Sequence, residues 1–270
     1  MGAAELEPGG VKRPRMRKQR TLRQVIGCAG VGLHSGARVA LTLRPAAEDT
    51  GIWFRRVDRP GAPSIHAHPD NADTVDGATC LVDAAGGAVR SVDLLLAAIA
   101  ACELDNLLVE LSGPEVPAMS GTPQPFMLLL ECAGIVEQSR AAPWLEVMRP
   151  VEVVADGASA RVEPGLDLEV AIEQADAPTF ALTAQAGDVR GALFDRREPR
   201  RSPLDRKARE RGRAVAFEAL AGLALIPAGV SARYVERAGG PELRCALMRE
   251  LLSDPANYRL RNAGPVLAIN

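Results

Sequence analysis

Hydrophobic residues in the first half of the chain occur in short, partly alternating runs and then at helical spacing. The short runs are rich in Val, Ile and Leu, which is typical of β-strands. The pattern predicts strands at residues 23–28, 38–44, 51–57 and 106–111, and helices at residues 92–102 and 123–133. Ser91 and Thr122 stand where N-caps are expected, and Gly134 stands where the second helix should end.

The second half repeats this order of elements. Strands are predicted at residues 150–155, 166–172, 179–183 and 230–236, and helices at residues 208–226 and 241–252. A duplicated order of this kind indicates an α+β protein of two similar domains, each a sheet covered by two helices, with the helical layers packed face to face. We expect a disordered basic tail at residues 1–18, a first domain at 19–142 and a second at 143–270, with a cleft between the domains as the natural place for a site.

Composition narrows the class of protein. The formal net charge is −2, which offers no overall attraction to nucleic acid or to anionic lipid. No run of residues approaches the ~18–20 apolar positions of a membrane span. The five cysteines are widely spaced and odd in number, which suits free thiols in a reducing compartment. These features predict a cytoplasmic protein without a transmembrane segment.

The stretch from residue 187 to residue 213 is crowded with arginine and broken by prolines. Acidic residues interrupt its positive charge, which favours an exposed loop leading into a solvated helical turn. The alternative is a basic docking patch for a phosphorylated ligand or for an acidic protein surface.

Several segments occur in one order along residues 19–135 and together resemble a known family. They are Gln19-Arg20-Thr21-Leu22, Gly30-Val31-Gly32-Leu33-His34-Ser35-Gly36, Thr79-Cys80-Leu81-Val82, Leu104-Asp105-Asn106 and Pro114-Glu115-Val116-Pro117-Ala118-Met119. In this combination the chain resembles the UDP-3-O-acyl-N-acetylglucosamine deacetylases (LpxC) of lipid A synthesis in Gram-negative bacteria. The later segment, residues 213–252, follows the order of the family's last elements with little identity.

The resemblance implies a specific chemistry. The family uses zinc held by two histidines and one aspartate, an adjacent glutamate as general base, and a further histidine that assists the transition state. Three ligands leave a fourth zinc position for water, whose pKa the metal lowers toward ~7.

In this chain the corresponding positions are largely replaced. Asp93 stands for the glutamate base, Glu218 for the aspartate ligand, and Met119-Ser120-Gly121 for the family's "MDG" turn. The lost family positions, where a histidine or an acid is replaced by a residue that cannot serve, are Leu94, Ala214, Gly222 and Pro241. The resemblance therefore implies that zinc is absent, and residues 187–213 are too short and too polar for the family's acyl-chain tunnel.

The remaining candidates for chemistry are few. Asp93 and Glu218 are the remnants of a catalytic site, and the residues expected to line a ligand cleft are Cys80, Asp93, Met119 and Glu218. Cys80 could instead be a small buried hydrophobe, since no cation is placed to lower its thiol pKa. Glu218 could line the cleft or lie on the wet edge of its helix.

The chain has three histidines, and none is at a family position. His66 and His68 are two residues apart on an expected strand and would share one face, so with His34 they could form a new metal site. The alternative is that these histidines have ordinary structural roles.

These observations lead to three functional hypotheses. The leading one is a catalytically inactive homologue, a pseudoenzyme, that binds a UDP-sugar or lipid A intermediate or a protein of the lipopolysaccharide pathway. The alternative is an active deacetylase, or a related hydrolase that uses Asp93 and Glu218 as a carboxylate pair. The third, nucleic-acid binding through residues 12–20 and 196–213, is disfavoured because aromatic residues are not interleaved with the basic ones.

Overall fold

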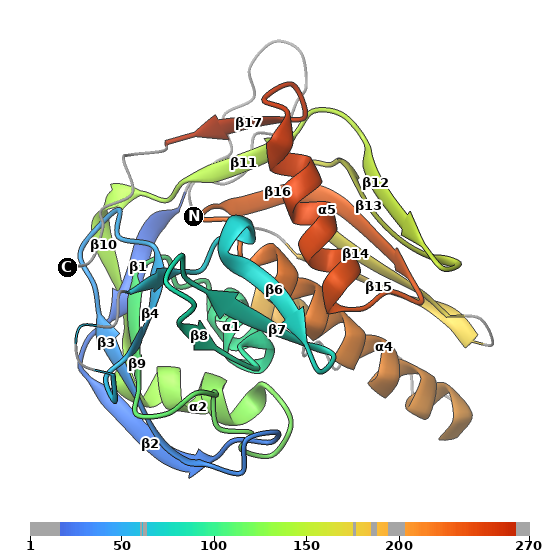
Figure 1. Ribbon diagram of the computed structural model, residues 1–270. Coiled ribbons are helices and arrows are strands. Elements are labelled where there is room, and N and C mark those ends of the chain that lie inside the picture. Colours follow the sequence, from blue (N-terminus) through green and yellow to red (C-terminus); the bar gives the residue numbers. More distant parts are fainter. Residues whose placement is uncertain are drawn as a thin grey trace.

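The computed structural model describes residues 17–59, 61, 64–174, 177–184, 188–193 and 203–262, and its elements divide into two halves (Figure 1). The first half contains β1 (Lys18–Leu22), β2 (Ile26–Val31), β3 (Arg38–Pro45), β4 (Ile52–Arg56), β5 (Ile65–His66), η1 (Pro69–Asn71), β6 (Ala72–Val75), β7 (Ala78–Val82), β8 (Ala88–Val89), α1 (Asp93–Ala101), β9 (Leu107–Leu111), α2 (Gln124–Ala133) and β10 (Ile135–Ala141). The second half contains β11 (Trp144–Val147), β12 (Val151–Ala155), β13 (Ala158–Pro164), β14 (Leu168–Gln174), β15 (Ala177–Ala184), α3 (Val189–Leu193), α4 (Pro203–Leu223), β16 (Gly229–Arg237), α5 (Pro241–Ser253) and β17 (Tyr258–Arg261).

The main sheet of the first half has the strand order β2-β3-β9-β4-β5. Every neighbouring pair is antiparallel except β4 and β9, which are parallel. A parallel pair needs a crossover connection, and α1 is the helix of that connection. Alternate residues of β9 are buried, as expected for a strand with one face against a core.

The second half builds the same arrangement around β16. Its strands run β12-β13-β16 in antiparallel pairs, and β16 is parallel to β14, which is antiparallel to β15. Helix α4 precedes the central strand and α5 follows it, as α1 and α2 do for β9. The predicted duplication of an α+β unit is therefore confirmed, with β11 and β17 added to the second sheet.

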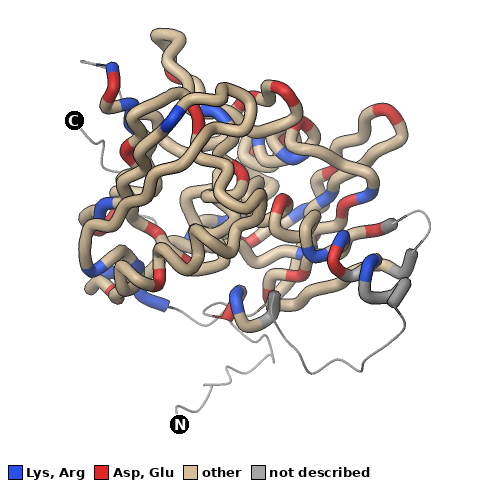
Figure 2. The backbone as a smooth tube through the Cα atoms, turned by 90° about the horizontal axis from the view of Figure 1, so that it is seen from below, with Lys and Arg blue, Asp and Glu red and all other residues tan. Residues whose placement is uncertain are grey.

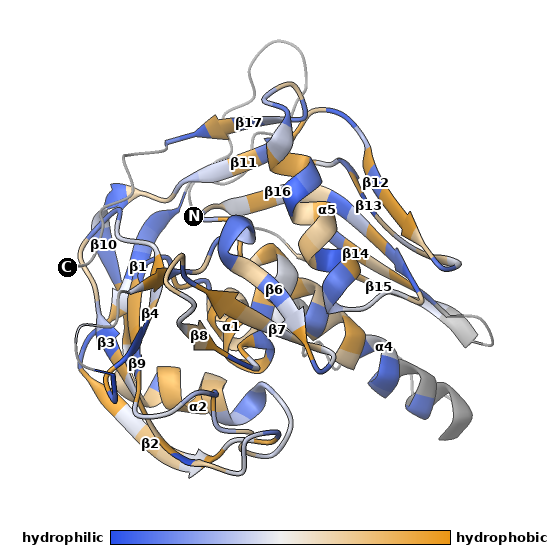
Figure 3. Ribbon diagram, viewed as in Figure 1, coloured by the Kyte–Doolittle hydropathy of each residue, from blue (hydrophilic) through white to orange (hydrophobic). Residues whose placement is uncertain are grey.

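The two halves meet through their helices. α1 packs directly against α4, α1 against α2, and α4 against α5 (Figure 1). α1 is apolar over nearly its whole surface (Figure 3), and its buried residues include Ala97, Ala98 and Ala101. Small side chains let two helices approach closely, and α4 supplies Ala216 and Ala219, which are also buried. One continuous core joins both halves.

Two predicted helix caps are wrong. The N-cap positions are Val92 and Pro123, and neither helix has a side-chain cap. The hydroxyl of Ser91 donates to Glu115 instead, and the hydroxyl of Thr122 is bonded to Ser120 at 2.9 Å. In both cases another side chain bonds the hydroxyl that the local pattern would assign to capping.

The predictions for the N-terminal tail, the arginine-rich stretch and the domain boundary had different outcomes. Residues 1–16 of the predicted basic tail lie outside the described residues, but Arg17 and Lys18 are ordered, because Lys18 begins β1 and the Arg17 guanidinium donates to Asp105 at 2.6 and 2.8 Å. Part of the arginine-rich stretch, residues 187 and 194–202, also lies outside the described residues, so its role stays a prediction. The domain boundary at residue 142 also stays a prediction, although the chain passes from the β1–β10 pair to the second sheet there.

Figure 2 shows positive and negative residues interspersed along the described backbone. Where the structure describes the helices, none combines the length and the hydrophobicity that crossing a membrane requires.

Glu115 joins three segments that are far apart in the sequence. Its carboxylate accepts hydrogen bonds from the backbone N–H of His34 at 3.1 Å, from the N–H of Ser35 at 2.8 Å and from the hydroxyl of Ser91 at 2.8 Å. The residue is fully buried. Gly32 is needed beside it, because a Cβ there would lie 2.4 Å from a carboxylate oxygen. Glu115 therefore links the Gly-rich turn to Ser91, which lies shortly before the start of α1.

The protonation of Glu115 follows from these contacts. Burial alone would raise its pKa, but the hydrogen bonds from Ser35, His34 and Ser91 lower that pKa to about 2. Since the folded-state pKa is below the ordinary value, the carboxylate stabilises the fold at neutral pH and loses this contribution as the pH falls from about 4.5 toward 2.

We expect Glu115→Gln to lower the free energy of unfolding by ~1–3 kcal/mol at pH 7, because the donors around position 115 lose their charged acceptor. The difference from the wild type should shrink as the pH falls from about 4.5 toward 2, where Glu115 becomes protonated. Denaturant unfolding at several pH values measures both. Glu137→Gln, at a half-exposed position, is the control, and an equal loss in both variants would contradict the assignment.

Candidate active site

A cavity of about 320 Å³ lies where α1, the start of α2 and the middle of α4 come together. Its walls come from both halves of the chain. It brings together the two carboxylates that the sequence singled out, along with two of the lost family positions. The lining residues are Asp93, Leu94, Ala97, Gly121, Thr122, Pro123, Gln124, Glu210, Arg213, Ala214, Phe217 and Glu218.

Asp93 is held in place by a neighbouring strand. It is the first residue of α1, and its carboxylate accepts the backbone N–H of Thr79 at 2.8 Å and also the Thr79 hydroxyl. Thr79 belongs to β7 and is buried. A carboxylate in the first turn of a helix is also favoured by the helix dipole. Asp93 is therefore a fixed acceptor at one wall of the cavity.

Glu218 stands on α4 and is 47% exposed. One carboxylate oxygen, Oε2, accepts a hydrogen bond from Arg244 Nη1 at 2.8 Å. Of the two alternatives left by the sequence, lining the cleft and lying on a wet helix edge, the structure places Glu218 in both, because it lines the cavity while half of its side chain meets solvent.

A buried hydrogen-bond network next to Glu218 was not predicted from the sequence. Arg244 is only 4% exposed and donates to Glu236 through Nε at 2.9 Å and through Nη2 at 2.6 Å. The hydroxyl of Tyr234 donates to the same carboxylate. Burial raises the pKa of Tyr234 well above its ordinary value, so the hydroxyl stays a donor. The only local signal was an arginine between the apolar Leu243 and Cys245.

Other expected site residues lie elsewhere. Met119 is 39% exposed and has a positive φ of 52°, but only its neighbours Gly121 and Thr122 line the cavity. Gly222 faces Arg244, and Pro241 begins α5 without lining the cavity.

Cys80 is 2% exposed on β7 and is not part of the cavity wall. Burial raises the pKa of its thiol, which is the opposite of what a nucleophile needs. This placement agrees with the alternative of a small buried hydrophobe.

The histidines have structural surroundings. The ring of His66 stacks on Trp53 at 4.9 Å and lies 5.8 Å from the ring of His68. Burial lowers the pKa of His66 to about 4, so it is neutral at physiological pH. The Nδ1 of His68 accepts the backbone N–H of Asp70. His34 is held through its backbone N–H by Glu115, in a different part of the fold.

The residues that the sequence resemblance assigns to the family's metal site do not fit zinc. Leu94 and Ala214 offer no donor, Asp93 is engaged by Thr79, and Glu218 is paired with Arg244. Across the part of the chain that the structure describes, no three His, Cys, Asp or Glu side chains are grouped so that they could hold a metal ion.

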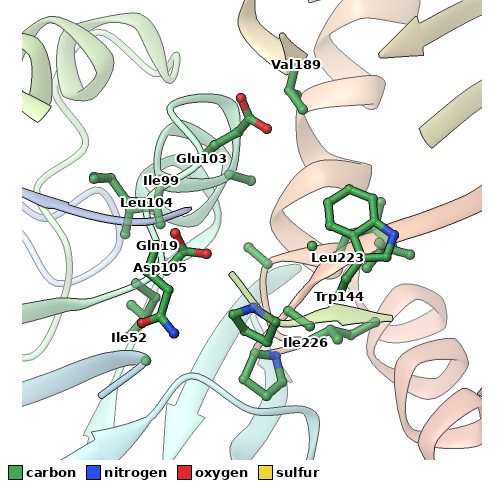
Figure 4. Close-up of a pocket in the computed structure, with 18 of the residues that line it drawn as sticks. Gln19, Ile52, Ile99, Glu103, Leu104, Asp105, Trp144, Val189, Leu223 and Ile226 are labelled. Atoms are coloured by element: carbon green, nitrogen blue, oxygen red, sulfur yellow. The ribbon is translucent and has the colours of Figure 1, made fainter. Parts of the chain in front are cut away.

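A second cavity, of about 170 Å³, lies at the C-terminal ends of α1 and α4 (Figure 4). Figure 4 shows Glu103 and Asp105 on one side and Trp144, Leu223 and Ile226 across from them. The acidic side chains are engaged by Arg17, with Asp105 in a two-bond pair and Glu103 at 3.7 Å. Its walls are otherwise largely apolar, so we assign the chemistry to the first cavity.

Comparison with known proteins gives this fold and cavity a family. The family model described as UDP-3-O-acyl N-acetylglycosamine deacetylase (LpxC) matches residues 19–195, which cover the first half and the start of the second. The chain belongs to this family of deacetylases. The resemblance carried by the sequence motifs is therefore confirmed.

Similar curated proteins are all named UDP-3-O-acyl-N-acetylglucosamine deacetylase. The one from Methylococcus capsulatus is 42% identical over 178 residues, covering 64% of this chain and 57% of the relative. The one from Thioalkalivibrio sulfidiphilus is 46% identical over 151 residues, covering 55% and 49%. The one from Idiomarina loihiensis is 41% identical over 176 residues, covering 64% and 57%. The chain thus spans about half the length of the curated relatives it matches.

The leading hypothesis of a catalytically inactive homologue is wrong on this finding. Relatives about 40% identical are named UDP-3-O-acyl-N-acetylglucosamine deacetylase, and the comparisons favour the alternative, an active enzyme. The hypothesis equated the loss of zinc donors with the loss of activity. Zinc is only one way of activating water, so the loss of its donors does not by itself remove the activity. The cavity and its two carboxylates are present.

We expect brief alkylation of the folded protein to modify the exposed Cys132 well before Cys80. The Cys80 thiol is buried and its pKa is raised, so it supplies little thiolate. Peptide mass spectrometry after timed exposure to iodoacetamide measures the order, and unfolding in denaturant should make both thiols react. Labelling of Cys80 at the rate of Cys132 in the folded protein would show that its site is open.

Proposed function

We propose that this chain is a deacetylase that removes the N-acetyl group from a UDP-3-O-acyl-N-acetylglucosamine. The observation that carries the proposal is the match of relatives named for this reaction, and a cavity lined by both Asp93 and Glu218 supports it. The ligand is accordingly a UDP-sugar.

We further propose that water is activated by carboxylate instead of by zinc. Glu218 suits the role of base, because Oε1 accepts no hydrogen bond from the residues described and the side chain is half-exposed in the cavity. Asp93 is fixed by Thr79 and suits the role of an acceptor that holds the substrate's polar hydrogens. Two carboxylates can divide such roles when their surroundings differ, as they do here.

The reaction balances without a further reactant. Glu218 takes a proton from water as the water oxygen bonds to the acetyl carbon. The carbon–nitrogen bond then breaks, and the proton passes to the sugar nitrogen. The second proton of the water also passes to the amine, so acetate and a protonated amine leave the cavity and Glu218 returns to its starting form.

We expect Glu218→Gln to lower kcat by ~10²-fold or more, because a positioned general base typically contributes 10²–10⁴-fold. Asp93→Asn should act mainly on KM, since an amide can still accept one hydrogen bond. Release of acetate from the acylated UDP-sugar measures both. Glu242→Gln, on the first turn of α5 and outside the cavity lining, is the matched control. Wild-type protein without turnover would overturn the proposed reaction.

We expect the purified protein to hold well below one equivalent of zinc and to keep its activity in a chelator, because its cavity lacks three donors. Plasma mass spectrometry after dialysis measures the metal content. Near one equivalent of zinc, with activity lost in chelator and restored by zinc, would overturn the carboxylate mechanism while leaving the deacetylase reaction standing.

A further inference from the structure

Arg244 occupies an unusual place for a charged residue. It lies on α5, is 4% exposed, and all three of its guanidinium nitrogens donate to carboxylates. Two of these bonds form a parallel fork with Glu236, whose side chain is 1% exposed. The third reaches Glu218 in the cavity wall at 2.8 Å. A planar guanidinium can make these three bonds at once, whereas an ammonium group cannot match the fork.

The helix opposite makes room for this arginine. Gly222 lies one turn after Glu218 on α4, and a Cβ at that position would be 3.2 Å from the Cβ of Arg244. Such a contact is tighter than ordinary packing allows without a shift of the neighbour. The glycine therefore allows Arg244 to lie close to α4 and reach back to Glu218.

Arg244 is the single positive charge between two carboxylates in this network. Arg244 and Glu236 form a neutral buried pair, and the Tyr234 hydroxyl donates to Glu236. Burial alone would lower the pKa of Arg244, but the bonds to Glu236 raise it above its ordinary value. The guanidinium is therefore a permanent positive charge directly behind Glu218.

We propose that Arg244 is a positioning residue for catalysis, which fixes one oxygen of Glu218 and thereby turns the other oxygen toward the bound substrate. This inference rests on the proposed function. In a cavity without three metal donors, the guanidinium supplies the fixed positive charge beside the working carboxylate. Arg244 is not among the residues that line the cavity, so it acts on the reaction through Glu218.

The test is a double-mutant cycle in kcat with Arg244→Lys and Glu218→Gln. Lysine keeps the positive charge but loses the fork, so Glu218 is held less firmly and kcat should fall ~10–100-fold with little change in KM. In the Glu218→Gln background the same change should alter kcat by less than about twofold, because its only route to the reaction is gone. A purely structural role for Arg244 would give equal, additive losses in both backgrounds.

Two further variants serve as controls for the role of Arg244. Arg249→Lys removes an arginine fork from the same helix, where it donates to the backbone carbonyls of Pro69 and Ala72, and should leave kcat unchanged. Gly222→Ala presses on Arg244 without changing any charge, and alanine favours the helix, so this variant tests the same route if Arg244→Lys fails to fold. It should lower kcat only when Glu218 is present.

The outcomes separate the two proposals. Turnover by the wild type with additive losses removes the role of Arg244 and leaves the deacetylase standing. Absence of turnover by the wild type removes the proposed reaction, and with it the positioning role. Non-additive losses in kcat, with Arg249→Lys silent, support both.

Discussion

The contact between α1 and α4 is the constraint on which the rest of the structure depends. Each helix is the crossover that makes a parallel strand pair possible in its own half, so neither can move without disturbing a sheet. Buried alanines on both helices allow a close approach. Because Asp93 begins one helix and Glu218 lies in the middle of the other, the same contact decides which polar side chains face each other across the cavity.

The buried ion pair behind the cavity has a different energetic character. Taking Arg244 and Glu236 out of water is costly, and their attraction repays this only if the geometry is good and the remaining hydrogen bonds are made. Here the fork, the Tyr234 hydroxyl and the bond to Glu218 satisfy the group. Such a network is weak evidence for stability, but it strongly restricts the arrangement of α4, β16 and α5, since any other packing would leave a buried charge without a partner.

Much of the fold could be predicted because local patterns and tertiary structure agree. The twelve segments assigned from hydrophobic spacing correspond to β2–β4, α1, β9, α2, β12, β14, β15, α4, β16 and α5. The short strands β6–β8, which pair with one another, were not predicted. The predicted cap of α1 was wrong because the Ser91 hydroxyl bonds to Glu115, which is far away in the chain. The role of Arg244 was missed for a similar reason, since its two partners, Glu218 and Glu236, come from other elements. The hypothesis of inactivity was wrong for a different reason. Missing zinc donors argue against one mechanism, but they do not show that no reaction occurs.

The duplicated topology has a consequence for how a bound molecule and the fold influence each other. The two walls of the cavity belong to different structural units, so a substrate that contacts both acts as a non-covalent crosslink between them. Its binding free energy is then added to the cohesion of the whole chain, and opening one unit must release the ligand. Ligand affinity and the cooperativity of unfolding therefore both depend on how strongly the two units hold together.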